Sequence, residues 1–148
     1  MFLRTLFVVL TCFFLLNNSS FSQKEYYNWV FGYYAWISFD TPDLKPIEIE
    51  GASQWVDHDA SSISDSNGNL LFYLGEGKLY NRNHQEVGNF PANESLINGN
   101  LIVRDPYNND LFYLFNIAGD GSANPDLYVN KIDLRLNNGL GGIVEERL

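Results

Sequence analysis

Short runs of hydrophobic residues alternate with polar turns along most of this chain. Runs rich in aromatic and β-branched residues lie at Trp29–Gly32, Ala35–Phe39, Leu70–Leu74, Asn100–Arg104, Leu111–Asn116 and Leu127–Asp133. No window of a dozen residues keeps the 3.6-residue period of an amphipathic helix. Short strands separated by turns are typical of all-β proteins, so we predict an all-β fold.

Asparagine and glycine mark the turns between these runs. The clearest signals are Asn67-Gly68, Asn98-Gly99, Asn108-Asn109 and Asn137-Asn138-Gly139. Both residue types accept the positive φ that tight hairpins require. No linker or low-complexity stretch divides residues 23–148, so we expect one β-rich region there.

An internal repeat is visible at an offset of 40 residues. The string Leu71-Phe72-Tyr73-Leu74 is identical to Leu111-Phe112-Tyr113-Leu114, and Asp65 aligns with Asp105. A repeat of about 40 residues with several short strands is typical of β-propeller blades, although aromatic hairpins can also match by chance.

The repeat predicts two blades, at approximately residues 52–98 and 99–148. The first blade's strands are expected at Ala60–Ser64, Leu70–Leu74 and Lys78–Asn81, and the second's at Asn100–Arg104, Leu111–Asn116, Leu127–Asp133 and Gly142–Glu145. Trp29–Phe39 is expected to form a preceding hairpin or the start of ring closure. The predicted fold is thus about two four-stranded antiparallel blades of an incomplete β-propeller. Because side chains alternate along a strand, Phe72 and Phe112 should face the same way, as should Tyr73 and Tyr113.

The first 22 residues have the order of a signal peptide. Arg4 precedes an apolar run at residues 6–16 and a polar stretch at residues 17–20. Ser20 and Ser22 fit the small-residue positions before a cleavage site, which we place before Gln23. The apolar run of about 11 residues is short for a span of roughly 30 Å, so we favour cleavage over a membrane anchor. The chain should therefore be secreted, to the periplasm or the cell surface, with no membrane span after cleavage.

Cysteine content and net charge limit the kinds of function that we expect for this chain. The single cysteine, Cys12, lies in the signal segment, and its acylation is a less favoured alternative. Nine Lys and Arg residues against 18 Asp and Glu residues give a net charge of −9. A nucleic-acid-binding protein needs a basic face, so we expect no nucleic-acid partner.

Several strings resemble a known family in combination. They are Asn28-Trp29-Val30-Phe31-Gly32, residues 60–73, Tyr80-Asn81-Arg82-Asn83-His84 and residues 131–141. Together they resemble the N-terminal β-propeller-like region of gliding-motility-associated surface proteins of gliding bacteria, which end in a type IX secretion sorting domain. The resemblance implies a cell-surface location and a propeller scaffold, and it carries over no site residues.

The sequence departs from that family pattern at two places. Gly75-Glu76-Gly77 stands where the family usually has an Asp-Gly turn, and the chain ends at Leu148 before further blades and a sorting domain. The second departure implies a truncated form of a larger surface protein.

Candidate metal ligands are sparse. Asp57 and Asp59 could share one strand face and bind a hard cation such as Ca²⁺, but they also fit a solvated loop. The segment from Asp65 to Glu76 matches a calcium loop only in part, and an Asn-Gly hairpin explains the same residues. We expect no cofactor.

The aromatic residues suggest a binding role. Trp29, Tyr33, Tyr34, Trp36 and Trp55 could form a platform for sugars, or they could be core residues. We expect a non-enzymatic surface segment for adhesion or ligand binding, with surface polysaccharide or other cell-surface proteins as partners. The alternative is part of a secreted carbohydrate-active enzyme that uses acidic residues. No Gly-x-Ser-x-Gly motif suggests a serine nucleophile.

Overall fold

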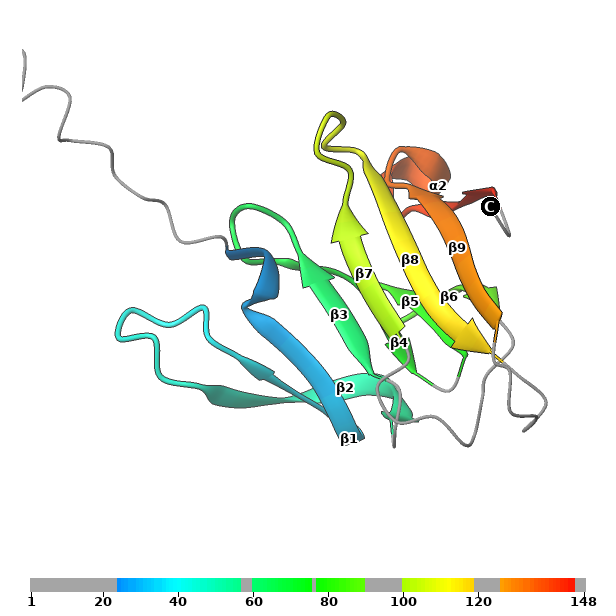
Figure 1. Cartoon of the computed structure of the whole chain (residues 1–148). Helices are drawn as coiled ribbons and strands as arrows, with labels where there is room; N and C mark the ends of the chain where they lie inside the picture. The colour runs from blue at the N-terminus through cyan, green and yellow to red at the C-terminus, as the bar shows by residue number, and fades with distance from the viewer. Residues whose placement is uncertain (1–23, 57–59, 76, 90–99, 119–125, 146–148) are drawn as a thin grey trace, which may run out of the picture.

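Antiparallel β-sheets make up most of the structure (Figure 1). This computed structural model describes residues 24–56, 60–75, 77–89, 100–118 and 126–145. The predicted signal peptide, at residues 1–22, lies outside the described residues. A short 3-10 helix, η1 (Lys24–Tyr26), precedes an antiparallel pair, β1 (Asn28–Ser38) and β2 (Ile47–Val56), which we call the N-terminal hairpin.

Two four-stranded antiparallel sheets follow, each with its strands in chain order. The first sheet contains β3 (Ser61–Ser64), β4 (Leu70–Gly75), β5 (Lys78–Asn81) and β6 (Glu86–Asn89). The second sheet contains β7 (Asn100–Arg104), β8 (Leu111–Ala118), β9 (Asp126–Asp133) and β10 (Gly142–Glu145). A single helical turn, α2 (Leu136–Gly139), joins β9 to β10.

The predicted all-β class and the antiparallel four-stranded sheets are confirmed. The described residues form no closed ring of blades. Trp29–Phe39 contributes one long strand, β1, rather than a hairpin of its own, and pairs with the unpredicted strand β2. Strand β6 was also missed, because the sequence Glu86-Val87-Gly88-Asn89 has little of the aromatic or β-branched character expected of a strand.

The aligned aspartates open equivalent turns. Asp65 Oδ1 accepts hydrogen bonds from the backbone N–H groups of Asn67 and Asn69, at 2.8 and 2.9 Å. Asp105 Oδ1 accepts from Tyr107 and Asn108 at 2.8 and 3.0 Å. These side-chain bonds replace backbone bonds that the turn cannot form. The offset of 40 therefore marks the same turn chemistry in both sheets.

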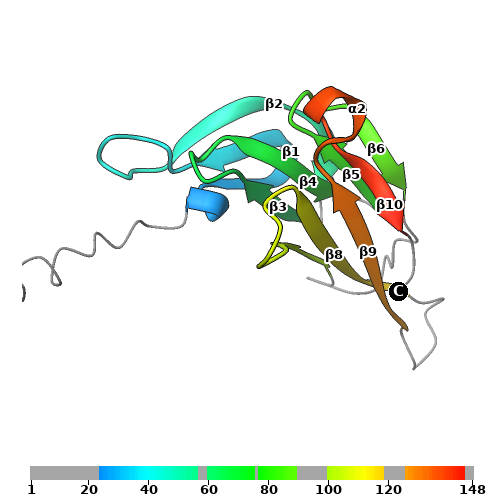
Figure 2. The same cartoon turned by 90° about the horizontal axis from the view of Figure 1, so that it is seen from above.

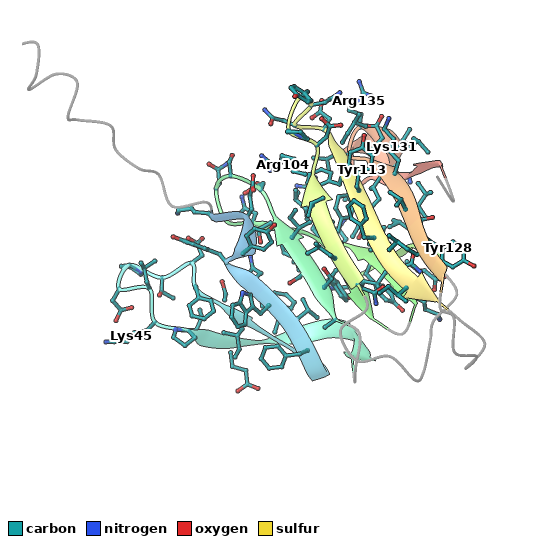
Figure 3. All side chains as sticks on the ribbon, in the orientation of Figure 1. Lys45, Arg104, Tyr113, Tyr128, Lys131 and Arg135 are labelled. Carbon is teal, nitrogen blue, oxygen red and sulfur yellow. The ribbon has the colours of Figure 1, made fainter. Side chains whose placement is uncertain are left out.

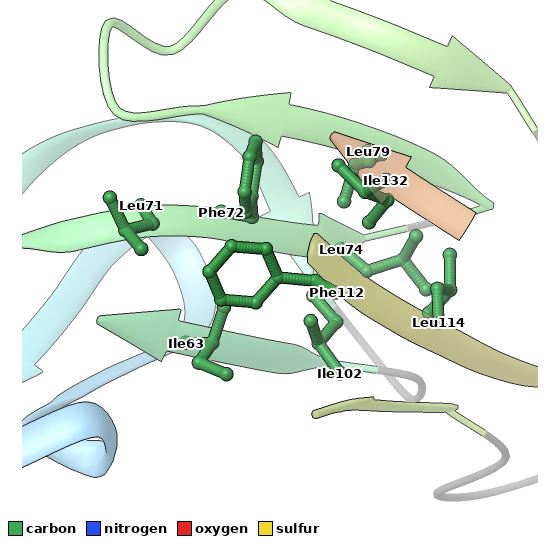
Figure 4. Close-up of a cluster of buried hydrophobic side chains, with 9 residues drawn as sticks. All are labelled: Ile63, Leu71, Phe72, Leu74, Leu79, Ile102, Phe112, Leu114 and Ile132. Carbon is green, nitrogen blue, oxygen red and sulfur yellow. The ribbon is translucent and has the colours of Figure 1, made fainter. Parts of the chain in front are cut away.

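The main core lies between the two sheets (Figure 4). Its buried side chains come from six strands, three of each sheet: Ile63, Leu71, Phe72, Leu74, Leu79, Ile102, Phe112, Leu114 and Ile132. Phe72 and Phe112 meet edge to face, with ring centroids 5.5 Å apart and an interplanar angle of 71°. The first strands of the two sheets are also tied together, since Ile102 N–H donates to Ser61 Oγ at 3.0 Å.

Phe72 and Phe112 occupy equivalent strands, β4 and β8, but they do not face the same way. In a ring of blades related by rotation, equivalent side chains all point round the ring in one sense. Here each ring points from its own sheet toward the other sheet, because the two rings touch in the layer between them. The 40-residue offset therefore aligns the two hairpins in sequence, but residues 40 apart do not occupy positions related by the rotation between neighbouring blades. The prediction that Phe72 and Phe112 face the same way was wrong.

The N-terminal hairpin covers the other face of the first sheet, so the molecule has three layers (Figure 2). Val30 of β1 packs there against Leu70, Tyr73 and Tyr80. The buried amide of Asn28 fastens this contact, since its Nδ2 donates to Ser64 Oγ at 2.8 Å and to the carbonyl of Gly68 at 2.6 Å. The first sheet is therefore covered on both faces.

The second sheet has one face that no other described element covers. The register places Leu101, Phe115 and Val129 in one cross-strand row on that face, with Ile117 opposite Leu127. Leu101 is 50% exposed and Leu127 is 61% exposed. Tyr113 and Lys131 lie beside each other on the same face, with the ammonium 6.0 Å from the ring centroid (Figure 3). We call this surface the open face.

Candidate binding groove at Trp36

Two adjoining hollows lie where the N-terminal hairpin meets the turns of the first sheet. One has a volume of about 370 Å³ and the other about 420 Å³, and both are within the size range of small-molecule sites. Trp36 and Ile47 line both hollows, and we call the combined surface the Trp36 groove.

The two halves of the groove differ in chemistry. The first half is mainly apolar and is lined by Phe31, Trp36, Ile37, Pro46, Ile47 and Glu48. The second half is polar, and its hydrogen-bonding side chains are Asn28, Ser38, Asp40, Asn69, Arg82 and Asn83. The groove therefore offers an aromatic and aliphatic surface next to short amide, hydroxyl and carboxylate groups.

Trp36 is the aromatic residue common to both halves. Its ring packs against His84, with centroids 5.1 Å apart and an interplanar angle of 34°. Its indole Nε1 is buried and has no hydrogen-bond partner among the described residues. A buried donor without a partner costs about 1–3 kcal/mol of stability, whereas the packing of the Trp36 ring on its apolar neighbours is favourable.

His84, which packs against the Trp36 ring, is itself held by its neighbours. Its backbone has a φ of 60°, and its Nδ1 lies 3.2 Å from the Tyr73 hydroxyl. Tyr73 stacks in turn on Tyr80, with centroids 5.1 Å apart. Burial lowers the pKa of His84 below its usual value, which keeps the imidazole neutral near pH 7.

The turn that carries His84 is set by one buried amide. Asn81 Oδ1 accepts from the backbone N–H groups of Asn83 and Gln85, at 2.9 and 3.2 Å. Arg82 in the same turn donates a hydrogen bond to the carbonyl of Gly139, in the connection between β9 and β10. The edge of the groove is thus anchored to both sheets.

Asp40 also lines the polar half. Its backbone N–H donates to Ser38 Oγ at 3.2 Å, and its carboxylate is 3.4 Å from Lys24 Nζ. Gly68 lies against it with a φ of 95°, and a Cβ there would come within 3.3 Å of the Tyr27 ring and 3.4 Å of Asp40 Cγ. A glycine at this position lets the hairpin and the Asn67-Gly68 turn approach closely.

The residues proposed from sequence are dispersed. Asp57 and Asp59 lie outside the described residues, and the described part of the chain holds no cluster of three His, Cys, Asp or Glu side chains. Both carboxylate oxygens of Asp65 accept hydrogen bonds inside its own turn, as the hairpin interpretation predicts.

Of the aromatic candidates, Trp36 lines the groove. Trp29 is 53% exposed, packs on Phe39 and lines neither hollow. The backbone pairs Tyr33 with Trp55 across the hairpin, but the side chains of Tyr33, Tyr34 and Trp55 lie outside the described ones. Sequence reasoning missed Arg82 and Asn83 as groove residues, because nothing local links their turn to Trp36, more than 40 residues away.

No family model, no curated protein and no solved structure matches this chain. The resemblance to gliding-motility-associated surface proteins therefore stays a prediction. Within the part of the chain that the structure describes, no helix is long and apolar enough to cross a membrane.

Proposed function

We propose that this chain is a secreted, non-enzymatic segment of a cell-surface protein that serves adhesion or ligand binding. The observation that carries the proposal is the Trp36 groove, where a tryptophan lies beside short polar side chains on two separate layers. Such a mixture of aromatic surface and few polar groups is typical of ligand sites. The partner is a surface polysaccharide or another cell-surface protein.

The stacked sheets support the scaffold part of the proposal. We infer that they are about two blades of an incomplete β-propeller, because each is a four-stranded meander and the two stack face to face. The open face of the second sheet is the surface on which a further sheet would stack, at about 10 Å. The opposed directions of Phe72 and Phe112 require the blades to be related by a different residue offset from 40.

Binding fits the groove chemistry better than catalysis does. Two carboxylates line the groove, Glu48 in the apolar half and Asp40 in the polar half, and Asp40 is paired with Lys24. The remaining groups are mainly amides and a hydroxyl, which form hydrogen bonds but do not exchange protons near pH 7. Glycoside hydrolysis needs two carboxylates on either side of the scissile bond, and one of the two in this groove is already held in an ion pair.

The test compares ligand binding in two tryptophan variants. The exported chain is screened by ligand-observed NMR against monosaccharides, amino-acid amides and short peptides. We expect at least one class to bind, with the signal lost in Trp36→Ala and kept in Trp29→Ala, the exposed tryptophan on the same strand. If no ligand class shows binding that depends on Trp36, the proposal is contradicted.

The enzymatic alternative has its own readout. Exported protein is incubated with soluble polysaccharides, and new reducing ends are measured. Turnover that disappears in Asp40→Asn would replace the binding proposal with the carbohydrate-active enzyme.

A further inference from the structure

We infer that the Trp36 groove binds a neutral hexopyranose unit of an oligosaccharide. This inference rests on the proposed function, and it names the class of ligand that the site takes. It is drawn from three features of the groove: its division into two chemical halves, the fixed positions of its polar groups, and its charge.

The division into halves matches the two-sided surface of a pyranose ring. Such a sugar has apolar C–H groups on a face and hydroxyl groups around its edge. Trp36 and Ile47 lie at the junction of the two halves, where an apolar sugar face can pack. The hydroxyl groups then reach the polar half.

The polar groups are held in place before any ligand arrives. Asn28 is buried, and both N–H groups of its Nδ2 are used by Ser64 and Gly68, so its side chain offers a ligand only the acceptor Oδ1. Asn83 sits in a turn whose backbone is bonded to Asn81 Oδ1. Groups that are already ordered lose little conformational entropy on binding, which favours recognition of weakly interacting hydroxyls.

The charge of the polar half is balanced. Its charged side chains are Arg82 and Asp40, one of each sign, and Lys24 pairs with Asp40. The apolar half adds Glu48, so two carboxylates and two cations lie in or beside the groove. An amide or a guanidinium donates to a hydroxyl oxygen, whereas a carboxylate accepts from a hydroxyl. Phosphate or sulfate recognition would call for several cations, so the balance favours an uncharged sugar.

The experiment measures binding of defined sugars to the exported chain. The probes are linear tetrasaccharides of glucose, mannose and galactose, and affinity is measured by isothermal titration calorimetry. We expect at least one tetrasaccharide to bind, with affinity reduced about tenfold or more in Trp36→Ala and largely kept in Trp36→Phe, because an aromatic face is retained.

Two controls keep the result clear if Trp36→Ala unfolds. Trp29→Ala should bind like the parent chain, since Trp29 lines neither hollow. Asn83→Ala removes an exposed amide at the polar edge and should weaken binding several-fold with no change in thermal melting. Parent-like sugar affinity in Asn83→Ala and in a folded Trp36→Ala would overturn the inference.

The outcomes separate this inference from the proposed function. Trp36-dependent binding of peptides or amino-acid amides, with no tetrasaccharide bound, would overturn the sugar inference and leave the binding function in place. No Trp36-dependent binding of any probe would overturn both.

Discussion

At the residue scale, single side chains decide where loops meet the core. Gly141 is the clearest case, with a φ of 81° and a position directly against the Phe72 ring. Any Cβ at residue 141 would fall on the edge of that ring. One glycine therefore allows the connection between the second sheet's last strands to close over the main core.

We expect Gly141→Ala to destabilise the protein by about 2–4 kcal/mol, because backbone strain adds to a clash with a buried ring. The matched control is Gly139→Ala, since Gly139 has nearly the same φ of 83° but meets only Arg82, 3.9 Å away. That variant should lose only about 1 kcal/mol. Urea unfolding measures both changes, and equal losses would contradict the predicted clash.

A second residue-scale prediction concerns pH. The Arg135 side chain, followed by its backbone N–H, donates hydrogen bonds to Asp133 and lowers the pKa of that carboxyl from 3.8 to about 2. A lowered native pKa means that the contribution to stability is full above pH 5 and is lost as the pH falls toward 2. Asp133→Asn should therefore narrow the stability difference between pH 5 and pH 2.

Arg135→Ala tests the cause of that pH dependence. The variant removes the side-chain partner of Asp133 and leaves the carboxylate. It should therefore also reduce the loss of stability between pH 5 and pH 2, as measured by urea unfolding. If both variants lose as much stability between pH 5 and pH 2 as the parent chain does, other groups control that loss.

At the element scale, the two hairpins that share Leu-Phe-Tyr-Leu play different parts in packing. Phe72 and Phe112 meet between the sheets, whereas Tyr73 packs under the N-terminal hairpin. Tyr113 lies on the open face, and its hydroxyl donates to Asp105 Oδ2 at 3.1 Å. The phenylalanines of the repeated string therefore share one layer, between the two sheets. Its tyrosines lie in two different places, under the N-terminal hairpin and on the open face.

A double-mutant cycle distinguishes these layers. Phe72→Leu and Phe112→Leu should show a coupling energy of about 0.5–1.5 kcal/mol, because the two rings are in contact. The control cycle, Tyr73→Leu with Tyr113→Leu, has the same 40-residue offset but should be additive within about 0.5 kcal/mol. Coupling in the tyrosine cycle alone would contradict the observed layers.

At the scale of the whole molecule, the three layers leave the open face of the second sheet uncovered by any described element. That face carries a continuous set of apolar side chains over three strands, with Leu101 and Leu127 at least half exposed. Monomeric proteins rarely expose large continuous apolar patches. The open face is therefore a specific surface on which to test self-association.

We expect the exported chain to self-associate as its concentration rises, as measured by analytical ultracentrifugation. The double variant Leu101→Glu and Leu127→Glu should remain monomeric, since it places charges on the open face. Tyr107→Glu is the control, because Tyr107 is 97% exposed in the turn before β8 and its variant should associate like the parent chain. A monomeric parent chain with a sharp thermal transition would instead identify a self-contained domain.

The sequence alone determined the local features of this protein. The all-β class, most strand positions and the turns opened by Asp65 and Asp105 follow from residue alternation and from side-chain bonds within a few residues. These forces act between near neighbours in the chain, so a one-dimensional pattern can reveal them. Strand β6 was missed because its residues have low β-propensity, and its pairing with β5 is what stabilises it as a strand.

Only the tertiary structure decided which faces meet and where a ligand can bind. The contact between Phe72 and Phe112 depends on how two sheets stack, and neither hairpin records the direction in which it will be covered. The Trp36 groove likewise joins Trp36 of β1 to the Arg82–Gln85 turn, which lies more than 40 residues further along the chain. Hydrophobic burial is not directional, so the apolar faces in a sequence do not specify their partners until the layers have packed.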